Sequence, residues 1–300
     1  KLVLLLEGLL VGILAGLVIV GYRICLTNGA LWLQRILAYC KQSIFTIIIW
    51  FVILFVIALV VTKLLDWESL ISGSGIPQLE GELAGKIDAK WWRVLIAKFF
   101  GGFLANFSGL ALGREGPSIQ LGAMVGKGIG KVLKRGKTEE RYLLTCGASA
   151  GLAAAFHAPL AGVMFALEEV HKHFSAPLLI SVMTSSIAAD YLMSSILGMA
   201  PVFSFNIHGT LPTQYYWMVI ILGIILGLLG AFYNKALLFV QSLYNHSKHL
   251  NNYTKLLIPF ILAGILGFTV PQLLGSGDTL VDLLIEGKLT MSLILLLLAG

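Results

Sequence analysis

Long apolar runs, separated by short polar or glycine-rich breaks, dominate the pattern of hydrophobic and polar positions along the chain. Residues 44–65 and 214–238 are two such runs, each of helical length. A helix needs about 20 residues to cross a hydrocarbon core of roughly 30 Å. A transmembrane β-barrel would instead show short segments of alternating hydrophobicity. The pattern therefore predicts an all-α, polytopic membrane protein.

The apolar runs and their breaks predict a series of helices of unequal length. They cover residues 1–39, 44–65, 77–85, 91–112, 116–133, 139–155, 158–172, 176–198, 214–245, 255–272, 278–286 and 289–300. The helix over 77–85 would be only about 13 Å long and cannot span a membrane. Short apolar helices that begin after Gly- and Pro-rich turns are typical of discontinuous membrane helices, whose ends hold ions near the midplane. We therefore expect tilted and discontinuous helices among the spans.

An internal repeat is visible in the glycine pattern. The Gly-Ser-Gly triplet at 73–75 returns at 275–277, and each copy follows an apolar span and precedes a Glu-Gly pair. The spans over 1–65 correspond to those over 214–272, which predicts a two-fold structural repeat of the kind common in transporters. We expect a first membrane repeat over 1–198, an external linker over 199–213 and an incomplete second repeat over 214–300.

The two ends of the chain lack the usual signals. The first residue is Lys1, and the last apolar run, 291–300, has no polar exit. We interpret 2–22 as a spanning helix and not a signal peptide, because it is long, carries Glu7 and lacks a small-residue cleavage site. The expectation is a fragment that lacks the C-terminal part of a longer protein.

Composition agrees with a membrane protein, since 58% of the residues are hydrophobic, 12% are charged and the mean hydropathy is +0.90. Soluble domains carry about 25% charged residues, so lipid must cover much of this surface. Cys25, Cys40 and Cys146 have no metal-binding spacing and fit buried small residues. The sequence contains no metal, haem or nucleotide motif, so we expect no cofactor and no enzymatic activity.

Charge sets the expected orientation. The net charge of +6 comes from scattered Lys and Arg at the ends of spans, without a patch typical of nucleic-acid binding. Six basic residues between Lys127 and Arg141 mark a loop on the inner side of the membrane. No Lys or Arg lies between Lys172 and Lys235, so the loop over 199–213 is predicted to be outside.

One motif, made of Gly113, Arg114, Glu115, Gly116 and Pro117, joins the end of one apolar span to the start of another. Pro is favoured in the first turn of a helix, and the glycines leave backbone N–H groups accessible. A helix N-terminus has unpaired donors and partial positive charge, so it favours an anion. The Glu115 carboxylate could occupy that anion site and leave on protonation, which predicts a gate. The alternative is an ordinary helix-start acid, and we expect Arg114 to pair with a nearby acid.

The same logic recurs in Gly73, Ser74, Gly75, Ile76 and Pro77. A serine between glycines precedes a short helix that begins at proline. Its hydroxyl and the neighbouring N–H groups could coordinate a partly dehydrated halide. The alternative is a serine that only caps the helix.

A third motif, at 151–162, is rich in small residues and broken at Pro159, which is typical of close helix packing. It leads to Glu168 and Glu169 at the inner end of the helix over 158–172. A buried carboxyl on the cytoplasmic side could pass protons inward. The alternative is a solvated acidic pair, although acids at a helix C-terminus oppose the dipole.

In this order, the motifs at 73–77, 113–117 and 151–169 resemble consecutive signatures of the CLC chloride channel/transporter family. The resemblance covers essentially the whole chain. It implies the inverted-repeat architecture of that family, and a prokaryotic chloride/proton exchanger type in particular. It also implies a homodimer with one pathway per subunit, in a lipid bilayer, most simply a prokaryotic cell membrane.

The resemblance also implies roles for individual residues. Ser74 would be the central anion-coordinating serine, Glu115 the external gating glutamate and Glu169 the internal proton-transfer glutamate. The further anion-binding positions would be Gly75, Ile76 and Gly116, supported by Gly73, Pro77, Gly113, Arg114 and Pro117. A serine at position 74 resembles the chloride-preferring members.

The chain departs from the family pattern at several points. Gln78 follows the first motif where many relatives have Glu, and His157 replaces a common Asn. The family's third anion-site motif, GxFxP, and its pore tyrosine are absent; both would fall beyond Gly300. The chain therefore holds part of the expected anion site.

These features predict exchange of chloride for protons, with both as transported partners. A passive, gated chloride channel of the same family is the nearest alternative. A remote alternative is an intramembrane serine hydrolase, because residues 147–151 fit G-x-S-x-G around Ser149 and His157 follows. That motif requires a strand-to-helix turn, whereas here it lies in an Ala-rich apolar helix.

Overall fold

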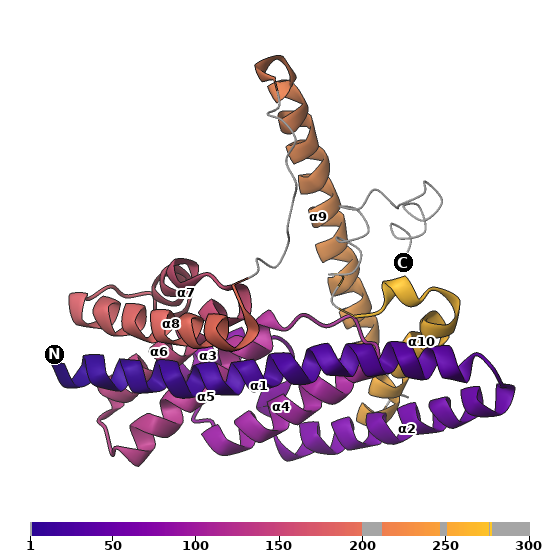
Figure 1. Ribbon diagram of the computed structural model, residues 1–300, viewed down its shortest axis with the longest axis horizontal. Helices are drawn as coiled ribbons and strands as arrows, with labels where there is room; N and C mark the ends of the chain where they lie inside the picture. The colour runs from indigo at the N-terminus through magenta and orange to yellow at the C-terminus, as the bar shows by residue number, and fades with distance from the viewer. Residues whose placement is uncertain (1, 200–211, 247–250, 276, 278–300) are drawn as a thin grey trace.

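The computed structural model describes residues 2–199, 212–246, 251–275 and 277, and these residues form helices without a strand (Figure 1). The longest helix, α1 (Leu2–Cys40), runs the length of the main bundle, with other helices packed along it. The all-α class predicted from the apolar runs is confirmed.

The remaining elements follow in chain order and vary widely in length. They are α2 (Ile44–Trp67), η1 (Ser69–Ile71), α3 (Ile76–Leu83), α4 (Trp91–Phe107), α5 (Glu115–Val132), α6 (Lys137–Phe156), α7 (Pro159–Phe165), η2 (Ala166–His171), α8 (Ala176–Leu197), η3 (Thr213–Tyr215), α9 (Tyr216–His246), α10 (Asn252–Thr269) and η4 (Pro271–Leu273). The short helix predicted after Gly75 is present as α3. The predicted helices over 278–286 and 289–300 lie outside the described residues.

One boundary prediction is wrong, since the helix expected to continue to residue 112 ends at Phe107. The Ser108 hydroxyl donates to the helix carbonyl four residues earlier at 2.8 Å, and Gly109 then adopts a φ of +89°. A left-handed residue at this place ends a helix. The non-helical segment 108–114 carries the chain to the start of α5.

The helix predicted over 158–172 is also not uniform. It begins as the α-helix α7 and continues from Ala166 to His171 as a π-helical turn, which ends where Lys172 adopts a φ of +59°. Glu168 and Glu169 lie in this turn. Short π segments are rare and occur frequently at functional sites.

By length and composition, five helical segments within the described residues can cross a membrane: α1, α2, α8, α10 and the segment Thr213–Tyr244. Small residues let the helices between these spans approach one another closely. Gly122 of α5 and Gly147 of α6 face each other so closely that a Cβ on either would overlap the other's carbonyl oxygen. Gly8 of α1 packs in the same way on the backbone of Ser181 in α8. Packing of this kind is typical of membrane helices.

Buried apolar side chains form three clusters, each shared by several helices. The first joins α1, α5, α6 and α8, and the third joins α1, α2 and α10. The second cluster lies around α3, α4 and α5, where it includes Ile71 and Leu79 on either side of the Gly-Ser-Gly loop. The residues that flank this loop are therefore anchored in the packed core.

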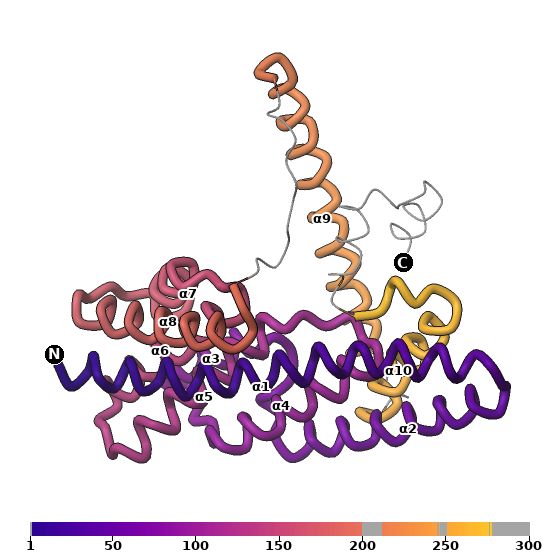
Figure 2. The backbone as a smooth tube through the Cα atoms, viewed as in Figure 1, coloured from indigo at the N-terminus to yellow at the C-terminus, as the bar shows by residue number. Residues whose placement is uncertain are grey.

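Helix α9 extends away from the main bundle, as the tube in Figure 2 makes clear. Its apolar side chains are exposed along its length, for example Ile220, Leu228 and Phe239 at 67%, 68% and 64%. Helix α10, by contrast, packs against α2. The division into two repeats with an external linker stays a prediction, since the linker and much of the second repeat lie outside the described residues.

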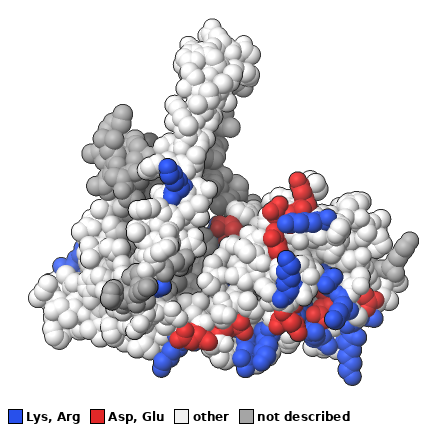
Figure 3. Space-filling view, turned by 180° about the vertical axis from the view of Figure 1, so that it is seen from behind, with Lys and Arg blue, Asp and Glu red and all other residues white. Residues whose placement is uncertain are grey.

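On the face seen in Figure 3, charged side chains gather along one end and the lower edge, and most of the other atoms drawn belong to uncharged residues. One ion cluster has a buried lysine at its centre. Lys127 of α5, at 0% exposure, contacts the Glu82 carboxylate and donates to Asp88 and to the carbonyl of Ala89, both at 2.7 Å. The cluster ties the C-terminal end of α3 to α5.

Removing the charge of either carboxylate in this cluster should lower stability, but by unequal amounts. The Glu82 side chain is only 8% exposed, so Glu82→Gln leaves the Lys127 ammonium buried with one acid fewer. We expect that change to cost about 3–5 kcal/mol of unfolding free energy. Asp88 is 83% exposed, so Asp88→Asn should cost at most about 1 kcal/mol. Thermal unfolding in detergent measures both, and equal losses would contradict this account.

The contribution of Asp88 should also depend on pH. The hydrogen bond from Lys127 lowers the pKa of the Asp88 carboxyl below its ordinary value. A carboxyl with a lowered folded pKa stabilises the protein above its unfolded pKa of about 3.9, and this contribution is lost as pH falls through the folded pKa. The stability difference between wild type and Asp88→Asn should therefore be constant from about pH 5 to 8 and shrink below about pH 4. A difference that grows on acidification would exclude this assignment.

Candidate functional site

The starts of α3 and α5 meet, which brings together two motifs about forty residues apart in the sequence. A Cβ built on Gly116 would lie 2.9 Å from the Ser74 Cβ and 2.7 Å from its carbonyl oxygen. Residues 73–77 and 113–117 therefore adjoin through backbone, as an anion site between two helix N-termini requires. Only a glycine at position 116 permits this approach.

Gly75 gives the first loop its shape. It is the N-cap of α3 with a φ of +95°, and a Cβ there would overlap the Gln120 side chain. Ser74 is therefore not the capping residue. Its Oγ accepts a hydrogen bond from the Ile76 N–H at 3.3 Å, and its own hydroxyl proton can still be donated to a ligand. Ser74 is exposed in this chain.

Glu115 is the first residue of α5, and its partly buried carboxylate folds back over the loop that precedes it. One carboxylate oxygen occupies the place where a Cβ on Gly113 would stand. The helix N-terminus favours this negative charge. The carboxylate therefore lies where an anion approaching the two helix starts would compete with it.

A cavity of about 340 Å³ lies beside the start of α3. Ile76, Phe165, Glu168 and Glu169 line it. Both glutamates are exposed, so the buried carboxyl considered from the sequence is wrong for this chain and the solvated acidic pair is what the structure shows. Exposed carboxylates can exchange protons with water. Ile76, which directly follows the Gly-Ser-Gly loop, therefore shares this cavity with the acidic pair.

Two residues that hold this loop were not singled out from the sequence, namely Lys98 of α4 and Gln120 of α5. Both are buried, and both donate to backbone carbonyls just before Ser74. Lys98 could have been found from the sequence, because it is an ionisable residue within an apolar helix. Such residues are costly in membrane helices and usually functional.

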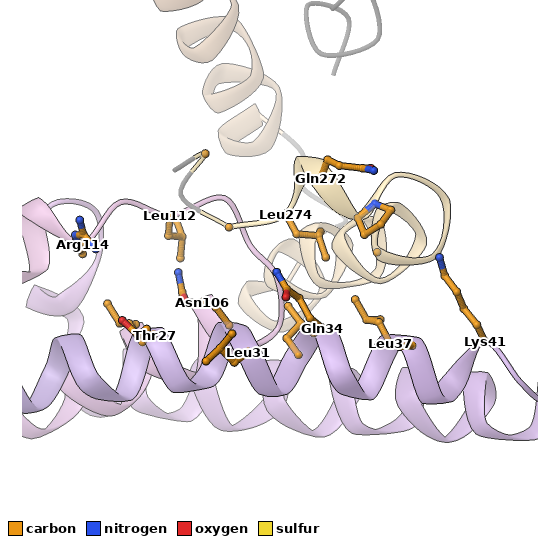
Figure 4. A pocket seen from close by; sticks show the side chains of 18 residues that line it. Thr27, Leu31, Gln34, Leu37, Lys41, Asn106, Leu112, Arg114, Gln272 and Leu274 are labelled. Atoms are coloured by element: carbon orange, nitrogen blue, oxygen red, sulfur yellow. The ribbon is translucent and has the colours of Figure 1, made fainter. Parts of the chain in front are cut away.

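A larger cavity, of about 580 Å³, lies elsewhere, between α1 and the segment that includes η4 (Figure 4). Arg114 and Leu112 lie at one end of it and Lys41 at the other, with Leu31 and Leu37 of α1 between them. Neither Ser74 nor Glu115 nor Glu169 lines this cavity. Arg114 belongs to the motif at 113–117, so the larger cavity adjoins the start of α5, whereas Ile76, Glu168 and Glu169 line the smaller one. We assign function to the place where the starts of α3 and α5 meet, because Gly116 packs on Ser74 there.

The Ser149 alternative receives no support from the geometry. Ser149 is 0% exposed within the continuous helix α6, and its hydroxyl pairs with that of Ser186. The strand-to-helix turn that exposes such a nucleophile is therefore missing. His157, the C-cap of α6, contacts Arg23 at 3.0 Å and not Ser149.

Helices that break within the bundle and point two N-termini at one place define a class of multi-pass membrane transport proteins. Residues 54–300 match the family described as voltage gated chloride channel, and the chain belongs to that family. It is a multi-pass membrane protein, as the apolar runs predicted.

This chain is similar to known members of the family in both sequence and fold. The chain is 37% identical over 236 residues to the H(+)/Cl(−) exchange transporter ClcA of Vibrio parahaemolyticus, with 76% of this chain and 50% of that protein covered. For ClcA of Vibrio campbellii the identity is 36% with the same coverage. The crystal structure of a slow cyanobacterial Cl⁻/H⁺ antiporter matches 98% of this chain and 70% of its own at a TM-score of 0.90 and 30% identity. The chain spans about half the length of the Vibrio relatives.

Because the two loops touch through backbone, the stability of the protein should be sensitive to a side chain at position 116. Gly116→Ala would push the Ser74 loop away, because the new Cβ would lie within 3.0 Å of three Ser74 atoms. Overpacking of this kind costs about 1–3 kcal/mol of unfolding free energy. The matched control is Gly21→Ala in α1, where a Cβ meets nothing within 4 Å and Ala is the better helix former. Thermal unfolding measures both variants, and an equal loss of stability in the two would refute the contact.

Proposed function

We propose that the protein exchanges chloride for protons across a membrane, with Glu115 as gate, Ser74 at the anion site and Glu169 as the inner proton-transfer group. The observation that carries this proposal is the meeting of two helix starts, in which Gly116 packs on Ser74. Ile76, two residues further on, lines the cavity of Glu169. The names of the Vibrio and cyanobacterial relatives support the same activity.

The two helix starts supply what a dehydrated halide needs. Each N-terminus carries about half a positive charge and unpaired N–H donors. Interactions with these fixed dipoles are stronger in a low-dielectric interior than in water. The Ser74 hydroxyl adds a donor, because its oxygen is already held by the Ile76 N–H.

Competition between chloride and the Glu115 carboxylate couples the two ions. As an anion, the carboxylate lies at the helix start and blocks the approach of chloride. Protonation removes its charge, so its attraction to the dipole falls and chloride can take the site. The proton then leaves towards Glu169, whose exposed carboxylate can return it to water on the other side.

A passive chloride channel is the second candidate, and the family description as voltage gated chloride channel favours it. A channel and an exchanger differ in proton movement, since only an exchanger moves protons when a chloride gradient alone is imposed. That measurement separates the two candidates.

We further propose a homodimer in the plasma membrane of a prokaryote. Large apolar side chains are exposed on α7 and α8, among them Leu160, Met164, Ile187 and Tyr191 at 68%, 54%, 54% and 75%. Such a surface fits a partner subunit or lipid. The mass of the complete protein in detergent, measured by light scattering, would contradict the dimer if it were that of a monomer.

Both the gate and the inner carboxyl should be necessary for coupled transport. In liposomes that hold the complete protein, Glu115→Gln should abolish proton uptake driven by a chloride gradient but keep chloride flux, because a neutral amide can neither block the site nor carry a proton. Glu169→Gln should lose proton uptake in the same way.

Glu139→Gln is the matched control, since Glu139 is exposed in the first turn of α6, away from both cavities. It should leave both fluxes unchanged. Proton uptake that persists in Glu115→Gln at the rate of the wild type would remove Glu115 from the mechanism.

A further inference from the structure

The carbonyl groups just before Ser74 are held by a buried lysine. Lys98 of α4 is 4% exposed, and its ammonium donates to the carbonyl of Ile71 at 2.8 Å and to that of Gly73 at 2.7 Å. No carboxylate among the described residues pairs with it. A buried ammonium without a counterion is costly, so its two backbone partners are essential to its placement.

Two amide side chains complete the pattern. Gln120 of α5 donates from Nε2 to the carbonyl of Leu70 at 2.8 Å, and Gln78 of α3 donates from Nε2 to the carbonyl of Ser72 at 2.8 Å. With the two carbonyls that Lys98 holds, four consecutive carbonyl oxygens, 70 to 73, each accept from a side chain. The donors come from three different helices.

This arrangement decides which side of the loop an anion meets. Carbonyl oxygens are the negative ends of the peptide dipoles and would repel a halide. Bound to side chains, the four carbonyls are held in one orientation. The Ser74 hydroxyl proton remains for the anion, because the Ile76 N–H already donates to the Ser74 oxygen. The Lys98 charge, uncompensated by an acid, adds to the favourable potential at this place.

We propose that Lys98, Gln120 and Gln78 form a carbonyl clamp that positions the anion loop, and that the charge of Lys98 sets the strength of anion binding at Ser74. The inference deepens the proposed function and rests on it. These are positioning residues, since they act through the loop and not by touching the transported ion.

Gln78 gives the clamp a chemical signature. It stands where the family pattern has Glu, and a carboxylate has no proton to donate to the Ser72 carbonyl. In Gln78→Glu the bond can form only when the new carboxyl is protonated. Protonation of Glu115 favours anion binding in every variant, so each variant is compared with the wild type at the same pH. The deficit of Gln78→Glu relative to the wild type should shrink as pH falls, whereas the deficit of Gln78→Met, which lacks a donor at any pH, should stay constant.

The test measures chloride binding by titration calorimetry and chloride flux in liposomes, with the complete protein. Lys98→Met keeps the apolar stem but removes the donor and the charge. Loss of a hydrogen bond to a charged group corresponds to about tenfold or more in an equilibrium constant. We expect the chloride Kd and KM of Lys98→Met to rise by about that factor, with a smaller change in maximal flux. Lys98→Arg, which keeps the charge, should restore part of the affinity.

Lys90→Met is the matched control, because Lys90 is exposed at the N-cap of α4, and it should bind chloride as the wild type does. If Lys98→Met does not fold, Gln78→Met tests the clamp instead. Its chloride Kd should rise less than that expected for Lys98→Met, because only one neutral hydrogen bond is lost. A chloride Kd within about twofold of wild type in the folded variants would overturn the clamp and leave the exchange function intact. A wild type that neither binds chloride nor moves protons would instead refute the proposed function itself.

Discussion

A single backbone contact, between Gly116 at the start of α5 and Ser74 before α3, is the constraint on which the rest of the site depends. Helix dipoles act over short distances and fall off within the first turn, so two N-termini help one anion only if their backbones nearly touch. A side chain at position 116 would separate them. The broken helices, the glycines around them and the placement of Glu115 all serve this one approach.

Both ends of α3 are held by lysines, although the helix has only eight residues. Before its start, Lys98 holds the carbonyls of the loop, and at its end Lys127 holds Glu82 and Asp88. A helix this short is not stable by itself, so its position is set by these contacts and by the core around Leu79. The same buried charges therefore support both stability and the geometry of the site.

The hydrophobic pattern predicted most of the described helices, because a helix that crosses lipid must satisfy its own backbone and stay apolar along its length. It did not predict the end of α4 at Phe107 or the π-helical turn at Ala166. Both depend on local backbone geometry, such as the φ of +89° at Gly109, which composition does not encode. It also passed over Lys98, whose role lies in contacts with residues more than twenty positions away.

By itself the sequence determined the membrane class, the two glycine-flanked helix starts and the acidic residues beside them, because these follow from local composition and the chemistry of helix termini. Only the tertiary structure decided that Gly116 lies on Ser74, that Ile76 shares a cavity with Glu169 and that the carbonyls before Ser74 are all bound. The physical reason is that an anion site inside a membrane is assembled from several helices. Its geometry is set by how their backbones and buried side chains pack, and no segment carries that information alone.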